Sequence, residues 1–297
     1  HAMEMSPRTW LLMMLLGLIW GGTFFLSEIL LLEMTPFQIV FHRVSIAAII
    51  MVIYITWRGK RLPRDKRSWF ALAIMGLLNN AIPFSAIVFG QQYITGGLAA
   101  ILNSTTAFFG VMLAGLFFKD ERLTFRRLIG VIMGIIGVAI IIGMDVLSHL
   151  SLTSIGQLLI IVSSISYAFA GIWGRLQVKN LGVEVTATGM LISSSVWMLI
   201  LATMVEGFPL EALSLQSTAA ILTFSVVCTA IAYLLYFAIL SAAGAANLTL
   251  VTIIIPPFAL MLDAFALGEW VTGQQLLGFA IIASGLLVIS GKLKFRR

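Results

Sequence analysis

The sequence predicts an all-α membrane protein of ten transmembrane helices, arranged as two inverted five-helix repeats around a central cavity. Three observations predict this fold: an apolar composition, the positions of the basic residues and an internal repeat. Hydrophobic residues make up 60% of the 297 residues and charged residues only 10%, whereas soluble domains carry about 25% charged residues. The composition therefore favours a chain that lies mostly within a lipid bilayer.

Ten apolar runs are long enough to cross a bilayer, which requires about 20 residues of helix. In chain order we expect helices over about residues 9–32, 36–57, 69–91, 97–118, 127–143, 153–174, 184–205, 217–240, 246–267 and 272–290. The runs are continuously apolar rather than alternating, which excludes transmembrane strands. Several connections are only a few residues long, so neighbouring helices are expected to form antiparallel hairpins.

The basic residues predict the orientation of these helices. All of the 18 Lys and Arg residues except Arg43 lie outside the apolar runs, near the two termini and on alternate loops. The intervening loops carry none, so the positive-inside rule places both termini in the cytoplasm. The net charge of +6 could also indicate a nucleic-acid partner. We reject that reading because basic residues beside membrane-length runs set topology and meet anionic lipid.

The chain also repeats itself. Residues 89–140 match residues 237–288 without a gap, at an offset of 148. Matched residues include Glu121 with Glu269, Thr124 with Thr272, Gly130 with Gly278 and Gly137 with Gly285. Each predicted half, 1–147 and 148–297, holds five helices, an odd number, so the second half enters the membrane from the opposite side. Inverted repeats are typical of secondary transporters, whose substrate site lies near the midplane between the halves.

Several short motifs extend this pattern. They are Ile19-Trp20-Gly21-Gly22, Phe41-His42-Arg43, the segment from Phe118 to Thr124, Leu267-Gly268-Glu269, and the glycines of helices five and ten, which we expect to pack closely. With these motifs the chain resembles the drug/metabolite transporter superfamily over nearly its whole length, and in particular the bacterial YddG-type amino-acid exporters. The resemblance implies export of aromatic and other amino acids, and of cationic toxicants, across a bacterial inner membrane. It also implies that helices five and ten form a dimer or scaffold face, which leaves a homodimer open.

Polar residues inside membrane helices are costly unless they face protein or water, so each is a candidate for the substrate site. The residues that we expect to line the central cavity are Trp20, Asn79, Asn80, Asn103, Tyr167 and Tyr233. Their rings suit aromatic or cationic substrates through stacking and cation–π contacts. Two alternatives remain at this point: core packing for the rings, and hydrogen bonds between helices for the amides.

Two further groups concern movement. Glu28, His42, Arg43 and Asp263 are predicted to act in gating or pairing. We expect Arg43 to pair with Glu28 because a lone Arg inside a membrane is costly. The pair has two interpretations: a structural contact, or a gate at the outer side of the membrane. Three prolines, Pro83, Pro256 and Pro257, interrupt apolar helices and are predicted to be kinks or hinges.

The absence of certain residues narrows the mechanism. None of the twelve carboxylates lies at the predicted mid-depth of a helix, and proton antiport usually requires a titratable group there. We therefore predict a facilitative carrier of amino acids that works by alternating access, with a proton-coupled multidrug exporter and a membrane channel as alternatives. Without a Walker loop, a His/Cys cluster or a converging catalytic set, we expect no cofactor, no metal and no enzymatic activity.

Overall fold

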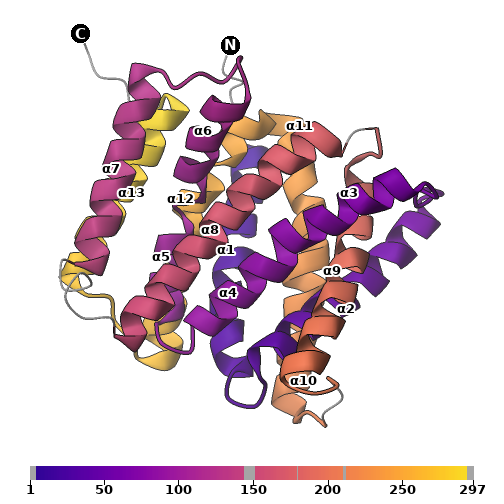
Figure 1. The fold of residues 1–297 in the computed structure, drawn as a ribbon. Coiled ribbons are helices and arrows are strands. Elements are labelled where there is room, and N and C mark those ends of the chain that lie inside the picture. Colours follow the sequence, from indigo (N-terminus) through magenta and orange to yellow (C-terminus); the bar gives the residue numbers. More distant parts are fainter. Residues whose placement is uncertain (1–4, 144–150, 179, 210–211, 293–297) are drawn as a thin grey trace.

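The computed structural model describes residues 5–143, 151–178, 180–209 and 212–292. Every regular element in this part of the chain is helical (Figure 1). In chain order, with η for a π-helix, the elements are α1 (Pro7–Leu30), α2 (Pro36–Trp57), α3 (Lys66–Gly76), η1 (Leu77–Ala81), α4 (Ile82–Gly90), α5 (Gly96–Asn103), α6 (Thr106–Phe117), α7 (Phe125–Ile142), α8 (Leu152–Gln177), α9 (Val183–Val205), α10 (Leu215–Leu222), η3 (Thr223–Ile231), α11 (Ala232–Leu248), α12 (Val251–Leu262), η4 (Asp263–Leu267) and α13 (Gly273–Ser290).

The predicted fold class is confirmed. Within the described ranges, nine helical segments are long and apolar enough to cross a membrane, and the shorter apolar helix Val251–Leu267 makes a tenth. The predicted end of the eighth helix, at residue 240, was wrong, because α11 continues to Leu248. The segment between these positions is rich in alanine and contains no proline, so it favours continuation of the helix. The ninth helix consequently begins at Val251 rather than at residue 246.

Side-chain caps fix where the helices begin. Seven residues at helix starts accept a hydrogen bond from the backbone N–H three positions later: Ser6, Asp65, Thr95, Thr124, Ser151, Ser214 and Thr272. Such caps satisfy backbone donors that have no partner inside the helix. At the other end, Gly143 and Gly291 close α7 and α13 with a positive φ of 79°, a conformation that glycine adopts without strain.

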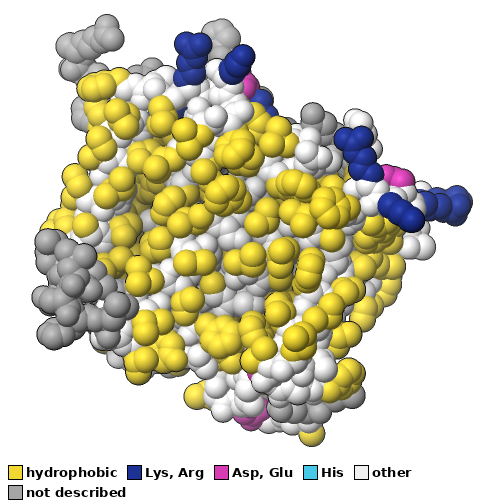
Figure 2. All heavy atoms as spheres, in the orientation of Figure 1, with side chains coloured by type: hydrophobic (Ala, Val, Ile, Leu, Met, Phe, Trp, Pro, Cys, Tyr) yellow, Lys and Arg dark blue, Asp and Glu magenta, His cyan; other side chains and the backbone are white. Residues whose placement is uncertain are grey.

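The two ends of the helical bundle differ in charge. The start of α1 and the end of α13 lie at the same end of the bundle (Figure 1), and on the face in Figure 2 the Lys and Arg side chains gather there, while hydrophobic side chains cover the middle. We call this the basic end. At the opposite end, which we call the acidic end, helices are joined by segments 31–35, 91–95 and 268–272, and these contain no Lys or Arg.

Helices related by the internal repeat occupy matching places. α2 packs along α9, and the offset of 148 maps residues 36–57 onto 184–205, which is α9 itself. The same offset maps α1 onto α8 and α6 onto α12. The contact of α1 with α12 therefore corresponds to the contact of α8 with α6. The predicted boundary between the halves, at residue 147, lies outside the described residues.

The glycines of α7 and α13 pack as the sequence predicts. A Cβ atom on Gly137 would lie 2.8 Å from the carbonyl oxygen of Gly278, and a Cβ on Gly278 would lie 2.8 Å from the carbonyl oxygen of Gly137. Gly130 and Gly285 face one another in the same way, at 2.9 Å and 2.8 Å. Only glycine permits this approach of two helix backbones.

Candidate functional site

Two π-helical segments lie midway along their helical spans at positions related by the repeat. The offset of 148 maps η1, residues 77–81, onto residues 225–229, which lie inside η3. In the first half, Pro83 follows η1 and has no N–H to donate to the preceding turn. The Ser166 hydroxyl, from α8, donates to the carbonyl oxygen of Leu78 at 2.6 Å. Wide turns of this kind occur frequently at functional sites.

The π-helix η1 positions the two predicted amides differently. Asn80 is fully buried; its Nδ2 donates to the Tyr233 hydroxyl at 3.0 Å, and its Oδ1 accepts from the Ser194 hydroxyl at 3.0 Å. Asn79 contacts α9 instead, where its Nδ2 lies 3.4 Å from the Met190 sulfur. Both amides therefore contact the second half of the chain, Asn80 through two hydroxyl groups and Asn79 through a methionine sulfur.

Arg43 lies beside this group and is almost completely buried, at 6% exposure. Its Nε donates to the Thr229 hydroxyl at 2.8 Å. Its guanidinium carbon lies 3.7 Å from the centre of the Phe84 ring and 4.3 Å from that of Phe224. The ring of Tyr167 is 6.5 Å from Phe84. These side chains form what we call the Arg43 group: Arg43, Asn80, Phe84, Tyr167, Phe224, Thr229 and Tyr233.

The predicted pair of Arg43 with Glu28 does not form. Among the described residues no carboxylate makes an ion pair with Arg43, and Glu28 accepts a hydrogen bond from the backbone N–H of Gly96 at the acidic end. We expected the pair because an unbalanced Arg inside a membrane is costly. Two aromatic faces and a hydroxyl hold the cation instead, because the negative faces of aromatic rings attract it.

The other predicted cavity residues have separate partners. The Trp20 ring lies 5.9 Å from that of Tyr236. Asn103 is the last residue of α5, and its Oδ1 is buried with no hydrogen-bond partner in the described chain. Of the six predicted residues, the structure thus gathers Asn80, Tyr167 and Tyr233.

Phe84 and Phe224 are residues of the Arg43 group that sequence reasoning missed, because nothing distinguishes them from other apolar residues of their runs. Thr229 is recognisable as a polar residue near the middle of an apolar run, and the repeat offset of 148 places it opposite Ala81, next to Asn80.

The remaining predicted hinge and gate residues lie on α12 and α2. Pro256 and Pro257 lie inside α12, shortly before η4. The carbonyl oxygen of His42 accepts from the Ser225 hydroxyl at 3.4 Å, and its ring lies 5.5 Å from that of Phe41. A role for these residues in movement remains a prediction.

A second polar group occupies the acidic end. Glu28 and Asp263 accept hydrogen bonds from the first two backbone N–H groups of α5: Gly96 donates to Glu28, and Gly97 donates to Asp263 at 2.6 Å. The carboxylate of Glu269 joins them, and one oxygen from each of the three lies within 4.8 Å of the others. We call these residues the carboxylate triad. The two predicted gating carboxylates therefore come together with a third that was not predicted.

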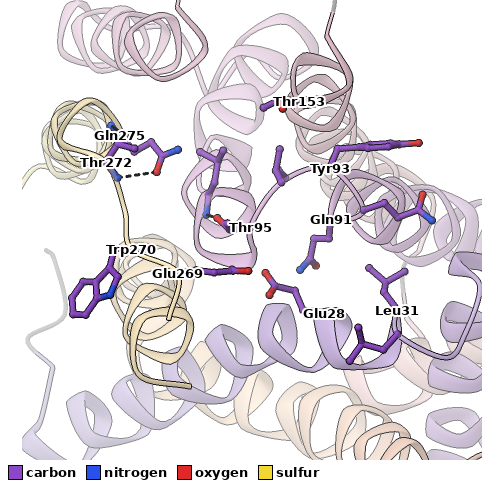
Figure 3. Close-up of a pocket in the computed structure, with 14 residues that line it drawn as sticks. Glu28, Leu31, Gln91, Tyr93, Thr95, Thr153, Glu269, Trp270, Thr272 and Gln275 are labelled. Atoms are coloured by element: carbon purple, nitrogen blue, oxygen red, sulfur yellow. Dashed lines mark hydrogen bonds between the residues drawn. The ribbon is translucent and has the colours of Figure 1, made fainter. Parts of the chain in front are cut away.

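A cavity of about 680 Å³ opens beside the triad. Figure 3 shows Glu28 and Glu269 directed toward one another at its base, with Gln91 close to Glu28. Leu31 comes from segment 31–35, Gln91 from segment 91–95 and Glu269 from segment 268–272, so all three of these segments contribute to the cavity. None of the described residues that line it is basic.

Comparison with known proteins shows what kind of protein carries these two groups. The model of the EamA-like transporter family matches residues 8–143 and, a second time, residues 154–291. The chain belongs to the EamA-like transporter family. It is therefore a multi-pass membrane protein of the drug/metabolite transporter superfamily, and the double match identifies two repeats in the chain.

Relatives of this EamA-like chain span nearly its whole length. An uncharacterized transporter of Archaeoglobus fulgidus is 27% identical and covers 97% of this chain and 99% of its own. The uncharacterized inner membrane transporter YedA of Escherichia coli K12 is 27% identical, with coverage of 94% and 90%. A probable amino-acid metabolite efflux pump of the same strain is 25% identical, with coverage of 99% and 98%. These relatives are named as transporters, not as enzymes.

A solved structure, described as "Crystal structure of protein", shares the fold. It has a TM-score of 0.68 and covers 95% of this chain and 97% of its own. Its sequence identity is 16%, so the likeness concerns the arrangement of the helices alone.

Proposed function

We propose that the chain is a secondary transporter that moves amino acids outward across a bacterial inner membrane by alternating access, with the Arg43 group as its substrate site. One observation carries this proposal: the buried Arg43 guanidinium has no carboxylate partner in the described chain. A buried charge is costly unless it is paired. The carboxylate that every free amino acid carries would supply the missing negative charge.

The surroundings of Arg43 favour a zwitterionic, partly apolar substrate. Arginine has five N–H donors, and a carboxylate can take two of them as a fork; one donor, Nε, is already bound to Thr229. Asn80 and the Tyr233 hydroxyl offer polar contacts for an amino group. The rings of Tyr167 and Tyr233 offer flat surfaces to an aromatic side chain. The relative named as a probable amino-acid metabolite efflux pump supports the same substrate class.

The same arrangement disfavours the two alternatives. A fixed positive charge at the centre would repel cationic toxicants, and no carboxylate in the described ranges pairs with it to exchange a proton for them. A channel would need a continuous aqueous path, whereas Asn80, Arg43 and Thr229 are buried. We therefore propose saturable, facilitative transport that needs no ion gradient.

The test is uptake of labelled phenylalanine into proteoliposomes of the purified protein, with and without an imposed pH gradient. We expect saturable uptake without the gradient. Phenylalaninamide lacks the carboxylate, so it should compete about 10- to 100-fold less well than phenylalanine. This factor corresponds to the free energy of one hydrogen bond to a charged group. Arg43→Gln should abolish this preference, and Arg43→Lys should keep part of it.

Asn79→Ala is the matched control for Arg43→Gln, since Asn79 lies beside Asn80 but contacts Met190 on α9. The control should keep the preference for the free carboxylate. Retention of that preference by Arg43→Gln would refute the assignment of Arg43. Uptake that appears only with the pH gradient would support the proton-coupled alternative instead.

A further inference from the structure

We propose that the carboxylate triad of Glu28, Asp263 and Glu269 is a binding site for a hard metal cation, with Ca²⁺ the best match and Gln91 a further oxygen ligand. This site is separate from the Arg43 group and does not depend on the identity of the transported substrate. The sequence predicted no metal site because it contains no His/Cys cluster. Here the ligand atoms are all oxygens, which hard cations prefer.

The spacing of the three carboxylates fits Ca²⁺. One oxygen from each residue lies within 4.8 Å of the other two. Oxygens bound to one Ca²⁺ at about 2.3–2.6 Å lie at most about 4.6–5.2 Å apart, so this spacing is compatible with a single ion. Ca²⁺ takes several carboxylate and amide oxygens, whereas Mg²⁺ is usually bound through only one or two carboxylates.

Two buried oxygens near the triad have no hydrogen-bond partner in the described chain: Oε1 of Gln91 and Oδ1 of Asp263. Gln91 is only 6% exposed, and its Nε2 donates to the carbonyl oxygen of Phe24 at 2.9 Å, which fixes the amide group. Figure 3 shows the end of this side chain directed toward Glu28. Buried acceptors without a donor are costly, and a cation would satisfy both.

The charge of the triad also lacks compensation. The N-terminus of α5 contributes about half of one positive charge, against three carboxylates. No Lys, Arg or His forms an ion pair with the triad in the described chain, and none lines the cavity. Helix capping explains Glu28 and Asp263, which bind Gly96 and Gly97. It does not explain Glu269, whose side chain makes no capping bond within the described ranges.

The site is accessible to ions from the acidic end. Glu28 and Glu269 line the cavity of about 680 Å³, while Asp263 lies behind them at 2% exposure. Water in the cavity would complete the coordination shell, as is usual for Ca²⁺ in proteins. The bound ion would connect α1, η4 and the segments 91–95 and 268–272, which belong to both halves of the chain.

The test is isothermal titration calorimetry, with CaCl₂ titrated into the full-length protein in detergent. The protein is first treated with a chelator, and the chelator is then removed. We expect one Ca²⁺ per chain. Glu269→Gln removes one ligand charge and should weaken binding about tenfold or more, because ligand charge sets Ca²⁺ affinity. Glu269 is exposed and caps no helix in the described chain, so this variant should fold as the wild type does. Identical thermal unfolding curves of the wild type and Glu269→Gln, both recorded with chelator, would establish that the variant is folded.

Glu33→Gln is the matched control, since Glu33 is a carboxylate of the acidic end that binds Ser214 and Ser217 instead. It should leave the Ca²⁺ affinity unchanged. The proposal fails if the wild type shows no binding up to about 10 mM CaCl₂, ten times the weakest affinity of extracellular Ca²⁺ modules. It also fails if Glu33→Gln weakens binding as much as Glu269→Gln, which would indicate general surface charge. Neither readout depends on transport activity.

Discussion

At the scale of single residues, carboxylates of the acidic end connect segments that are far apart in the sequence. The carboxylate of Glu206, which follows α9, accepts hydrogen bonds from the backbone N–H groups of Phe37 at 2.9 Å and Gln38 at 3.3 Å. These are the first donors of α2, whose own N-cap residue, Thr35, makes no side-chain cap. One acidic side chain thus supplies a helix cap and a tertiary contact together.

Replacement of this cap should lower stability. We expect Glu206→Ala to cost about 1 kcal/mol, because the N-terminal donors of α2 would lose their acceptor. Glu206→Gln keeps an acceptor oxygen and should cost less. Thermal unfolding in detergent, followed by tryptophan fluorescence, would measure both changes. Equal unfolding midpoints for wild type and Glu206→Ala would contradict the capping role.

Glu33 lies outside the membrane helices and provides a pH-dependent contact. Hydrogen bonds from the Ser217 and Ser214 hydroxyls lower the pKa of the Glu33 carboxyl below its ordinary value of 4.5. A carboxyl whose pKa is lowered by folding stabilises the protein above its unfolded pKa and loses that contribution as the pH falls through its folded pKa.

Wild type should therefore lose stability more steeply than Glu33→Gln as the pH falls from about 5 to about 3. The measurement is the midpoint of thermal unfolding at each pH. Parallel curves for the two proteins would show that these hydrogen bonds do not distinguish the folded from the unfolded chain.

At the scale of helices, close glycine contacts fix the α7–α13 pair. A Cβ atom on Gly137 would lie 2.6 Å from Cγ1 of Ile282 and 2.8 Å from the Gly278 carbonyl oxygen. The backbone oxygen cannot move aside without separating the helices. Gly137→Ala should therefore destabilise the fold by about 1–3 kcal/mol, the usual cost of overpacking.

Gly171→Ala is the control for this prediction. Gly171 lies within α8, and a Cβ atom there would meet no heavy atom within 4 Å. This variant should unfold at or above the wild-type temperature, since alanine favours a helix more than glycine does. If the two variants unfold alike, the glycine contact does not hold α7 against α13.

The number and order of the helices could be predicted because each membrane-spanning helix requires a run of about 20 apolar residues. The π-helices could not, since the width of a turn leaves no trace in hydropathy. Pro83 was the one local indication, because its missing N–H predicts a disturbed turn before it. The end of α11 was missed for a related reason: an apolar run and the helix that contains it need not end together.

At the scale of the whole molecule, the separation of charge between the two ends predicts its orientation. Arg64 lies in the exposed segment between α2 and α3 at the basic end, and Trp270 is 73% exposed at the acidic end. Cys228 is buried at 3% exposure, so it should not react in the intact protein. The positive-inside rule places the basic end in the cytoplasm.

A membrane-impermeant maleimide should therefore label Trp270→Cys in intact cells. It should label Arg64→Cys only after the membrane is permeabilised. The reverse pattern would invert the orientation and would place the carboxylate triad on the cytoplasmic side. Wild-type protein, with Cys228 alone, is the control for background labelling.

The two polar groups show how far sequence reasoning reaches at this scale. Asn80, Tyr167 and Tyr233 could be predicted because amide and hydroxyl groups at mid-depth are costly unless they face protein or water. The cation–π contacts of Arg43 could not, since Phe84 and Phe224 resemble any other apolar residue of their runs. The triad joins Glu28 to Asp263 and Glu269, and such a contact depends on how the two halves pack.

The glycine contact between α7 and α13 has a consequence for the assembly of the halves. Gly130 meets Gly285 and Gly137 meets Gly278. The offset of 148 maps Gly130 onto Gly278 and Gly137 onto Gly285, so the repeat converts one pair into the other. Such a contact is isologous, like that between the subunits of a two-fold dimer. At its glycine positions each half therefore carries both sides of this interface, as one subunit of a two-fold dimer does. The peptide link between the halves raises their effective concentration without adding to the glycine contacts themselves.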